Sequence, residues 1–550
     1  YTPNKTKITF EDYYREHGYI SEAGASEEDS YGKASVTAFM LFNGEKTENT
    51  AYCFGDVWYF KKDFIDEKIN HRFYHDAAND ELIYTTPTKI VTIPFDSQAY
   101  YVGDKVKKEH YVIARHIGDE IYIAVDFIKE RADFIYEVRT EPYRMLVVTE
   151  YGDREYVHIG DEGTVRTGAS IKDEILAIGD DGIYWAVTGD DGDWTELTTD
   201  DGIRGYIRTK ELEGSFTVTT ANDYQAPIYT SVSRKDKVNM VWHAVYDLND
   251  NGKIYSLLDA TQGVNVVSPT WFSLNDNKGN FSSLASEEYV TAAHAKGLKV
   301  WGLINDFDKN ISLKRILGRT STRSRLINNL VSTAMRYKLD GINIDFEKIK
   351  SEVAPAYLEF LRELTLVCHT NDITVSVDDY LPTDATAYYD WKEQGKVADY
   401  VIFMAYDEHY AGSKESGSVS SLPFVENGVD KGLQYIPAER TVVALPFYTR
   451  LWKEVKSGDG VSVSSSAYGM SSAESVLQSN SATPKWNDET SQYYAEFKAD
   501  GAKYKIWLEE ETSLSKKMET VMAKNVAGIA FWKLGFERMA TWTTIEKYVK

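Results

Sequence analysis

The stretch that decides the fold is Leu339-Asp340-Gly341-Ile342-Asn343-Ile344-Asp345-Phe346-Glu347-Lys348. Side chains along a strand alternate between two faces, so Asn343, Asp345 and Glu347 share one face and the apolar residues between them share the other. Acids that face one enclosed space repel each other and lose hydration, so this pattern indicates a chemical task for them. The alternative is an amphipathic surface strand with hydrated acids, and spacing alone leaves both interpretations open.

The length and net charge of the chain limit the number of domains it can form and the kinds of partner it can bind. A chain of 550 residues can form about two to four domains with substantial cores. Its 61 basic and 85 acidic residues give a formal net charge of −24, which argues against a nucleic-acid partner or an anionic membrane surface. No apolar run is long enough to span a bilayer. The 39 tyrosines and 12 tryptophans suit sugar stacking and β-rich cores equally well.

The first residue and the cysteines add two expectations. The chain begins with Tyr1 rather than methionine, which predicts that an export signal or anchor was removed, although a trimmed chain would look the same. Cys53 and Cys368 lie in different predicted domains, so no disulfide framework is expected. Neither cysteine has the spacing of a metal site, and we expect no metal and no cofactor.

Residues 1–143 predict a β-rich accessory domain. Its expected strands are residues 36–41, 57–60, 82–85, 90–93 and 121–125. Residues 56–64 and 120–127 each read as a strand followed by Asp-Phe, so they form a repeat. The region resembles the N-terminal domain of copper amine oxidases, which occurs as an accessory in bacterial surface proteins. No metal site follows from this, because the histidines lack ligand spacing.

Residues 144–220 predict a second small β domain, built of short strands and Asp/Gly turns. These turns lack the spacing of a calcium loop. Residues 165–170, 194–197 and 201–207 are similar to bacterial SH3 domains, where the central Trp, here Trp194, and the closing Gly-Tyr-Ile strand are core features. The resemblance implies either a wall-binding module or a plain spacer, and both remain open.

Residues 221–550 predict a (β/α)8 barrel, the TIM-barrel fold. Eight candidate strands alternate with helical segments: residues 238–245, 263–271, 299–304, 341–346, 373–377, 400–404, 441–446 and 528–532. An apolar stripe from Leu326 to Met335 predicts one helix, with Ser324 as its candidate N-cap. A long insertion separates strands seven and eight, and Asp500-Gly501 predicts a hairpin within it, between residues 493–497 and 504–508.

The active site of this fold lies at the carboxyl ends of the strands. Glu347 ends the fourth strand, which places its carboxylate at the mouth of the barrel. Asp345 lies one pleat deeper on the same face, about 6.6 Å back along the strand, close enough to share a proton or a hydrogen bond. Two acids in this arrangement can hold different protonation states, as acid catalysis requires.

Residues 340–347 also resemble the strand-four signature of glycoside hydrolase family 18, the family of chitinases and N-acetylglucosaminidases. Three further strand ends agree with that family in order: Met404-Ala405-Tyr406-Asp407 at strand six, Leu445-Pro446-Phe447-Tyr448-Thr449-Arg450-Leu451-Trp452 at strand seven, and Gly528-Ile529-Ala530-Phe531-Trp532 at the last strand. The resemblance covers residues 223–550.

The resemblance implies a retaining hydrolase that uses the substrate's own 2-acetamido group in place of an enzyme nucleophile, an exception to the two-carboxylate scheme. Glu347 is then the general acid and later the base. Asp345 accepts the acetamido N–H and stabilises the developing positive charge, while Tyr406 donates its hydroxyl to the acetamido oxygen. Asp407 contacts the sugar or steadies Glu347, and Trp532 forms the apolar floor under the N-acetylglucosamine ring.

Asn343 departs from the family pattern, because most of its chitinases carry aspartate at this position. The Asn-Ile-Asp-Phe-Glu version resembles the branch of bacterial spore-cortex glucosaminidases and related cell-wall enzymes, and residues 268–273 and 300–305 resemble that branch too. An asparagine still offers a hydrogen bond that holds Asp345.

Asp378 and Asp379 follow strand five without a clear motif match. Further substrate-binding candidates, each with a structural role as its alternative, are Trp271, Asn305, Tyr448 and Arg450.

These patterns predict an N-acetylglucosaminidase that acts on peptidoglycan of the cell wall or spore cortex. The alternatives are a chitinase or endo-N-acetylglucosaminidase on another glycan, and a non-catalytic carbohydrate-binding wall protein. We expect a secreted, cell-wall or spore-associated bacterial monomer whose partner is an N-acetylglucosamine-containing polysaccharide.

Overall fold

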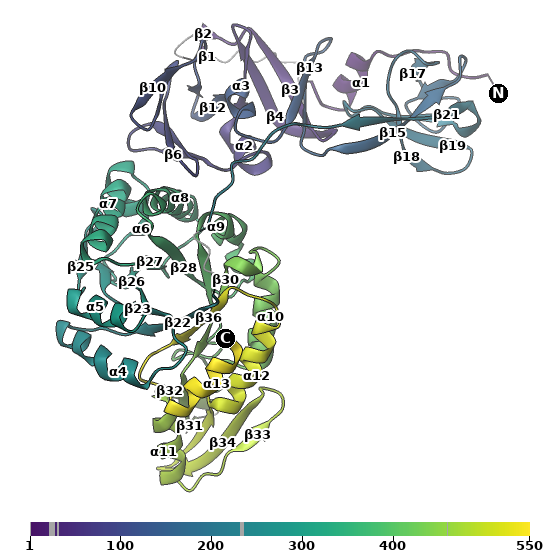
Figure 1. Ribbon diagram of the computed structural model, residues 1–550. Coiled ribbons are helices and arrows are strands. Elements are labelled where there is room, and N and C mark those ends of the chain that lie inside the picture. The colour runs from purple at the N-terminus through teal and green to yellow at the C-terminus, as the bar shows by residue number, and fades with distance from the viewer. Residues whose placement is uncertain (1, 21–27, 30–31, 232–235, 459, 550) are drawn as a thin grey trace. The chain divides into compact units, whose positions relative to one another are not determined.

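The computed structural model describes residues 2–20, 28–29, 32–231, 236–458 and 460–549 (Figure 1). The chain divides into two compact units, each considered by itself. The first unit comprises Tyr1–His75, Asp80–Tyr84 and Ile90–Pro227, and the second comprises Asp76–Asn79, Thr85–Lys89 and Ile228–Lys550. The predicted domain boundaries at residues 143 and 220 stay predictions.

The first unit is rich in β-strands, as predicted. A seven-stranded sheet has the order β11-β12-β5-β4-β3-β14-β13. Its strands are β3 (Val36–Phe42), β4 (Glu45–Phe54), β5 (Val57–Lys61), β11 (Ala114–Ile117), β12 (Glu120–Ala124), β13 (Ile135–Arg139) and β14 (Arg144–Val148). A five-stranded sheet contains β6 (Phe73–Asp76), β7 (Glu81–Thr85), β8 (Ile90–Pro94), β9 (Ala99–Val102) and β10 (Lys105–Lys108), and a short ribbon joins β1 (Glu28–Asp29) to β2 (Gly32–Lys33).

The repeat seen in the sequence is also a structural repeat. Strand β5 leads into helix α2 (Lys62–Lys68) and strand β12 leads into helix α3 (Val125–Lys129). The two strands pair antiparallel, with Ile123 opposite Phe60. Phe64 and Phe127, the aromatic residues of the two Asp-Phe pairs, are both buried. Each copy therefore places a phenylalanine in the core next to its strand.

The remainder of the first unit is a smaller β structure. Its five-stranded sheet has the order β17-β16-β20-β19-β18, and β15 (Gly152–Ile159) pairs with β21 (Leu212–Thr220). The five strands are β16 (Thr164–Arg166), β17 (Ile175–Ile178), β18 (Ala186–Asp190), β19 (Trp194–Thr198) and β20 (Arg204–Arg208), and helix α1 (Phe10–Glu16) adds Tyr13 and Tyr14 to the same apolar core.

The tryptophan in this core is Trp185, not Trp194. Trp185 is fully buried, whereas Trp194 is half-buried and has the Arg208 guanidinium 5.1 Å from its ring centre. The cation contact lets Trp194 stay at the surface, where its apolar area is covered only in part. The likeness of this region to bacterial SH3 domains stays a prediction.

The second unit contains the predicted closed barrel of eight parallel strands. The strands are β22 (Val238–His243), β23 (Val266–Pro269), β26 (Lys299–Asn305), β27 (Gly341–Asp345), β28 (Thr374–Tyr380), β29 (Tyr400–Met404), β30 (Thr441–Pro446) and β36 (Gly528–Trp532). Each pairs with the next, and β36 pairs back onto β22, which closes the barrel. A side hairpin of β24 (Phe272–Leu274) and β25 (Phe281–Ser283) joins the edge of β26.

The barrel interior is packed with side chains, among them Met240, Trp301, Leu303 and Ile402. A glycine is required at the start of β27, because a Cβ on Gly341 would lie 2.5 Å from the indole of Trp301. On the other face of β27, Phe346 stacks on Phe360 of helix α8 (Ala354–Thr370), with ring centres 5.8 Å apart. The predicted alternation of polar and apolar faces along this stretch is therefore confirmed.

Helices surround the barrel (Figure 1). They are α4 (Ile254–Ala260), α5 (Glu287–Ala295), α6 (Leu313–Leu317), α7 (Thr320–Tyr337), α8, α9 (Trp391–Val397), α10 (Leu422–Gly432), α12 (Glu511–Met522) and α13 (Met539–Val549). The predicted N-cap Ser324 is wrong, since α7 begins at Thr320 after Arg319. Its first turn is polar but contains Arg323, which is fully buried, so the apolar pattern misses the true start.

The insertion between β30 and β36 is a small α/β lobe. It contains a five-stranded sheet of β31 (Tyr448–Ser457), β32 (Gly460–Gly469), β33 (Lys485–Asn487), β34 (Gln492–Ala499) and β35 (Ala502–Trp507), and helix α11 (Met470–Ser479). The predicted hairpin is β34–β35, and Asp500 and Gly501 at its turn both have positive φ, as a tight hairpin turn requires.

No helix in the described ranges is long and apolar enough to cross a membrane. Cys53 and Cys368 are both buried and free.

A buried ion pair ties α7 to α8. Arg323 Nη2 lies 2.8 Å from Glu363 Oε1, and both side chains are almost wholly buried. Burial raises the pKa of Glu363 to about 7 even though Arg323 opposes the shift. Replacing Arg323 by Ala leaves this carboxyl without its cation, so we expect the free energy of unfolding of the barrel to fall by about 3–5 kcal/mol.

Urea denaturation followed by tryptophan fluorescence measures this change. The paired variant Arg323→Met/Glu363→Met removes both charges and keeps most of the volume, so we expect it to recover most of the loss. A paired variant as unstable as Arg323→Ala would show that packing rather than the unpaired charge causes the effect.

Candidate active site

Residues at or just after the carboxyl ends of seven barrel strands surround one cavity of about 240 Å³. The cavity is narrow and its walls are aromatic or acidic. It is lined by Trp242, Phe307, Asp345, Glu347, Asp378, Tyr380, Met404, Tyr406, Asp407, Tyr448 and Trp532. Six of the ten predicted site residues, Asp345, Glu347, Tyr406, Asp407, Tyr448 and Trp532, therefore meet at one place.

Asn343 lies directly beneath this cavity and is fully buried. Its Oδ1 accepts hydrogen bonds from Trp242 Nε1 at 2.9 Å and from Ser268 Oγ at 3.1 Å. Its Nδ2 donates to Ser376 Oγ at 3.0 Å and to Asp378 Oδ1 at 2.8 Å. All four hydrogen-bonding positions of the amide are used, and none of them by Asp345, so the expected bond from Asn343 that holds Asp345 is wrong. Asn343 instead fixes the four groups around it, and its contact with a substrate stays a prediction.

Asp345 points into the cavity from the end of β27. It is 6% exposed, and its Oδ1 is buried without a hydrogen-bond partner among the described residues. Burial raises the pKa of Asp345 well above its usual range, and the nearby carboxyls of Asp378 and Glu347 raise it further. An oxygen in this condition is available to accept a hydrogen bond from a ligand.

Glu347 stands at the mouth, two residues beyond the end of β27. Tyr380, the last residue of β28, donates its hydroxyl to Glu347 Oε2. Burial raises the pKa of Glu347, the bond from Tyr380 lowers it, and the carboxyls of Asp306 and Asp407 raise it. The net shift is upward, so Glu347 holds a proton over a wider pH range than an exposed glutamate and can act as an acid.

Asp306 positions the chain that carries Glu347. Its two carboxylate oxygens accept the backbone N–H groups of Glu347, at 3.1 Å, and of Lys348, at 3.0 Å. Lys348 Nζ in turn donates to the backbone carbonyl of Asp306 at 2.7 Å. These bonds take the place of strand pairing just where β27 ends, so they fix the height of Glu347 above the cavity.

Aromatic residues from the last three strands and the first strand of the barrel close the other side. Tyr448 donates its hydroxyl to Asp407 Oδ1 at 2.5 Å, and its ring lies edge-on to Tyr406 with centres 6.2 Å apart. Burial raises the pKa of Tyr406 well above its usual range, so its hydroxyl stays a donor. Trp532 lies against Trp242, with ring centres 5.9 Å apart, and their faces form an apolar wall.

Besides Asn343, three predicted substrate-binding residues do not line the cavity. Trp271 is buried and donates its Nε1 to Asn251 Oδ1 at 2.8 Å. Asn305 is 7% exposed and accepts the backbone N–H of Phe307. Arg450 lies on β31 and donates to Ser465 Oγ at 3.2 Å. Contact of these residues with a substrate stays a prediction.

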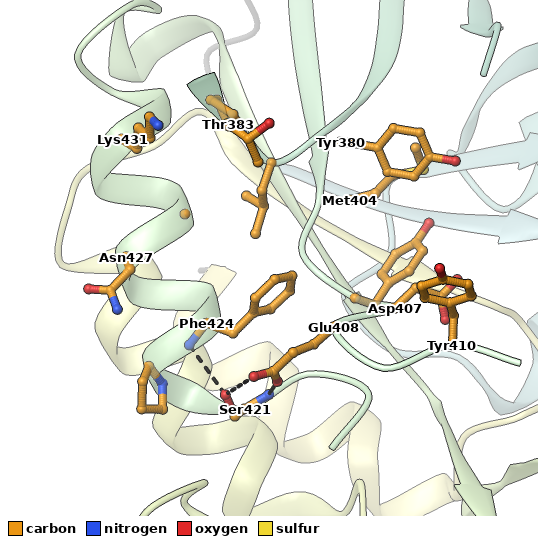
Figure 2. A pocket seen from close by; sticks show the side chains of 15 residues that line it. Tyr380, Thr383, Met404, Asp407, Glu408, Tyr410, Ser421, Phe424, Asn427 and Lys431 are labelled. Carbon is orange, nitrogen blue, oxygen red and sulfur yellow. Dashed lines mark hydrogen bonds between the residues drawn. The ribbon is translucent and has the colours of Figure 1, made fainter. Parts of the chain in front are cut away.

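A larger groove of about 800 Å³, the side groove, adjoins the cavity and shares Tyr380, Met404, Tyr406 and Asp407 with it. Figure 2 shows its opposite wall, helix α10, from which Phe424, Asn427 and Lys431 project. The start of α10 is fixed by Ser421, whose Oγ bonds Glu408 Oε1 at 3.0 Å and the backbone N–H of Phe424 at 3.3 Å (Figure 2). Lys431 pairs with Asp384, Nζ to Oδ1 2.6 Å.

Several contributors had no assigned role in the sequence interpretation, among them Trp242, Asp306, Asp378 and Tyr380. Strand five was expected to end at residue 377, but β28 continues to Tyr380, which carries Asp378 and Tyr380 to the mouth. The acidic pair at 378 and 379 after an apolar run was the available signal. Within the described ranges, no group of three or more His, Cys, Asp or Glu residues is arranged to hold a metal ion.

The sequence of the chain matches a known protein family. Residues 205–537 match the sequence model of a family described as Glycosyl hydrolases family 18. The uncharacterized glycosylase YvbX of Bacillus subtilis is 27% identical over 281 residues, which cover 48% of this chain and 79% of that protein. The cortical fragment-lytic enzyme of Bacillus subtilis is 26% identical over 235 residues, 41% of this chain and 54% of that protein, so the match spans about half of that relative.

The solved structures support the fold. The spore cortex-lytic enzyme SleL of Bacillus megaterium superimposes with a TM-score of 0.51 at 17% identity, covering 60% of this chain and 79% of that one. The two chains thus share the barrel fold.

The Asp306 bonds give a prediction about the mouth. Asp306→Ala removes both acceptors, and each charge-assisted bond contributes about 1.5–3 kcal/mol. We expect the backbone amides of Glu347 and Lys348 to exchange with solvent much faster, measured by hydrogen exchange and mass spectrometry of the peptide over residues 341–350. Asp308→Asn is the matched control, because among the described residues the Asp308 side chain bonds Asn310 and neither Glu347 nor Lys348. Unchanged exchange in Asp306→Ala would refute the positioning role.

Proposed function

Because the chain belongs to glycoside hydrolase family 18 and is a glycoside hydrolase, we propose that it cleaves β-linked N-acetylglucosamine with retention of configuration, in bacterial peptidoglycan. The observation that carries this proposal is the relation between Glu347 and Asp345. A carboxyl with a raised pKa stands at the mouth, and a buried carboxyl with an unpartnered oxygen lies just below it. The two acids face one cavity walled by Trp532.

Glu347 protonates the glycosidic oxygen as the bond to the anomeric carbon breaks. The carbonyl oxygen of the substrate's 2-acetamido group attacks that carbon, which gives a cyclic oxazolinium ion in place of a covalent enzyme intermediate. Asp345 accepts the acetamido N–H and its negative charge stabilises the cation. Glu347, now ionised, then removes a proton from the water that opens the ring, and this restores the acid.

The remaining residues orient the sugar. Tyr406 donates its hydroxyl to the acetamido oxygen, and Asp407, held by Tyr448, contacts the sugar. Trp532 stacks against the ring of the N-acetylglucosamine. Tyr380 stabilises the Glu347 carboxylate after its proton has left, because the Tyr380 hydroxyl donates to it.

The preference for peptidoglycan has two supports. A relative named cortical fragment-lytic enzyme matches the chain. In addition, the side groove meets the cavity at Tyr380, next to Glu347, so it lies where the leaving sugar would go. Its volume gives room for the lactyl or peptide substituent that muramic acid carries and that chitin lacks. We accordingly propose an exported, wall-associated or spore-associated bacterial protein that works as a monomer on the glycan.

Chitin is the second candidate substrate. Every group that we assign to the cavity addresses one N-acetylglucosamine unit, which chitin contains as well. The substrate therefore has to be decided by comparison of glycans.

The decisive variant is Glu347→Gln, which keeps the shape of the side chain but cannot give a proton. We expect it to lower the release of reducing ends from purified peptidoglycan by at least about 100-fold. Glu352→Gln is the matched control, because Glu352 is an exposed glutamate on the following loop. Unchanged turnover in Glu347→Gln, with the fold intact by circular dichroism, would refute the assignment.

The same assay identifies the substrate when it is run on sacculi, cortex fragments and chitin oligomers, with mass spectrometry of the new reducing end. N-acetylglucosamine is the expected end, and muramic acid would contradict a glucosaminidase. A glycan without the 2-acetamido group should resist cleavage, since the internal nucleophile is then absent.

Tyr380 gives a prediction about pH. Its hydroxyl favours the ionised form of Glu347, so Tyr380→Phe should raise the pKa of Glu347 and keep the acid protonated to higher pH. We expect the basic limb of the kcat/KM profile to move upward by about half to one pH unit. Tyr388→Phe is the control, because the Tyr388 hydroxyl bonds the carbonyl of Ile349 instead. A limb that moves downward or stays in place would contradict this role.

A further inference from the structure

A second buried acid, Asp378, lies beside Asp345. In the parallel pairing of β27 with β28, Asn343 lies opposite Ser376 and Ile344 lies opposite Val377. The next pair along the two strands is therefore Asp345 and Asp378. Neighbouring strands lie about 4.8 Å apart and residues at the same level point to the same side, so these two carboxyls adjoin each other in the cavity.

This pair has no cation to balance it. The cavity-lining residues include no lysine, arginine or histidine. The titratable groups around the pair lie on several elements. They are Glu347 on the Asp345 side, Asp306 after β26, Asp379 next in the chain, Tyr357 of α8, and Tyr380, Tyr406 and Asp407 toward the mouth. Each of these is neutral or negative. Two ionised carboxylates repel each other in such a place, whereas one proton held between them forms a hydrogen bond.

Asn343 sets the geometry of the pair. Its Oδ1 is committed to Trp242 and Ser268, which turns its Nδ2 toward Asp378 Oδ1 at 2.8 Å. One oxygen of Asp378 is thereby held by a donor, while Asp345 Oδ1 lies buried and unpartnered. A proton on the second oxygen of Asp378 can be donated to Asp345 without any change in the Asn343 network.

We propose that Asp378 is a positioning residue that shares one proton with Asp345. This inference rests on the proposed function. When the acetamido N–H of the substrate arrives, Asp345 must be an acceptor, so the shared proton resides on Asp378 and is donated to the Asp345 carboxylate. After product leaves, the proton is shared again. No proton enters or leaves the pair during turnover, and the charge of the pair stays at one negative unit.

The account agrees with the electrostatics of both groups. Burial raises the pKa of Asp378 well above its usual range, the bond from Asn343 lowers it, and Asp379 and Glu347 raise it. Burial raises the pKa of Asp345 in the same direction, with Asp378 as the strongest of its charged neighbours.

Two substitutions at one position test the proposal. Asparagine at 378 can accept from Asn343 through its oxygen and donate N–H to Asp345, so it imitates the protonated Asp378. Leucine can do neither, and Asp345 would then have to ionise alone in a buried place. We expect Asp378→Leu to move the acidic limb of the kcat/KM profile upward by at least about one pH unit, a tenfold loss below that limb. We expect Asp378→Asn to leave the limb within about half a unit of the parent.

Asp372→Asn is the matched control, since Asp372 is an exposed aspartate just before β28, at the end of the strand opposite to Asp378. The exchange variant Asn343→Asp/Asp378→Asn keeps the amide, the carboxyl and their hydrogen bond and moves the acid to the other strand. It should fold and should keep the acidic limb in place even where Asp378→Leu does not fold. If the acidic limb of the kcat/KM profile lay at the same pH in all variants, the proposal would be overturned. It would also be overturned if the acidic limb of the exchange variant moved as far as we expect for Asp378→Leu.

Infrared spectroscopy separates this proposal from the proposed function. The difference spectrum of the parent protein minus Asp378→Asn at pH 7 should contain one protonated-carboxyl band, because the bands of other buried acids such as Glu363 cancel in the difference. A parent protein that cleaves no N-acetylglucosamine glycan but shows this band would refute the proposed function and leave the shared proton standing. An active parent without the band would refute the shared proton alone.

Discussion

The site depends on one constraint, which is that several carboxyl groups must lie buried together without a cation. Burial of an ionised acid is costly unless hydrogen bonds or a proton compensate it. Here, Asn343 supplies the fixed donors beneath the cavity, and Asp306 holds the backbone that carries Glu347. Asp345 is left with a buried, unpartnered oxygen that a ligand or a neighbouring proton can satisfy. The cost of this arrangement indicates that it serves the chemistry rather than the stability of the barrel.

Much of the fold could be predicted from the sequence because its signals are local. Alternation along residues 339–348 separated the polar face from the apolar face, and eight apolar runs between helical segments defined the closed barrel. The hairpin at Asp500-Gly501 was equally visible, since its turn needs residues that tolerate positive φ. Ser324 failed as an N-cap because the true first turn of α7 holds a buried arginine, and burial of a charged residue depends on its distant partner, Glu363.

The candidate site was predictable only in part. Motifs identified Asp345, Glu347, Tyr406 and Trp532, which do meet at one cavity. The contribution of Asp378 was hidden, because two consecutive acids after an apolar run do not reveal which of them faces inward. Trp271 and Asn305 also stand at strand ends, yet their polar atoms bond to Asn251 and to the local backbone. A residue's position at a strand end therefore leaves the direction of its side chain open.

The central claim is that the substrate's acetamido group, activated beneath Glu347 by Asp345, takes the place of an enzyme nucleophile. Two successive displacements at the anomeric carbon preserve its configuration, whereas direct attack by water inverts it. Proton NMR of the first product formed from a β-linked N-acetylglucosamine glycan, recorded before the anomers equilibrate, tests this most directly. The account predicts the β-anomer at the new reducing end, and the α-anomer as first product would contradict it.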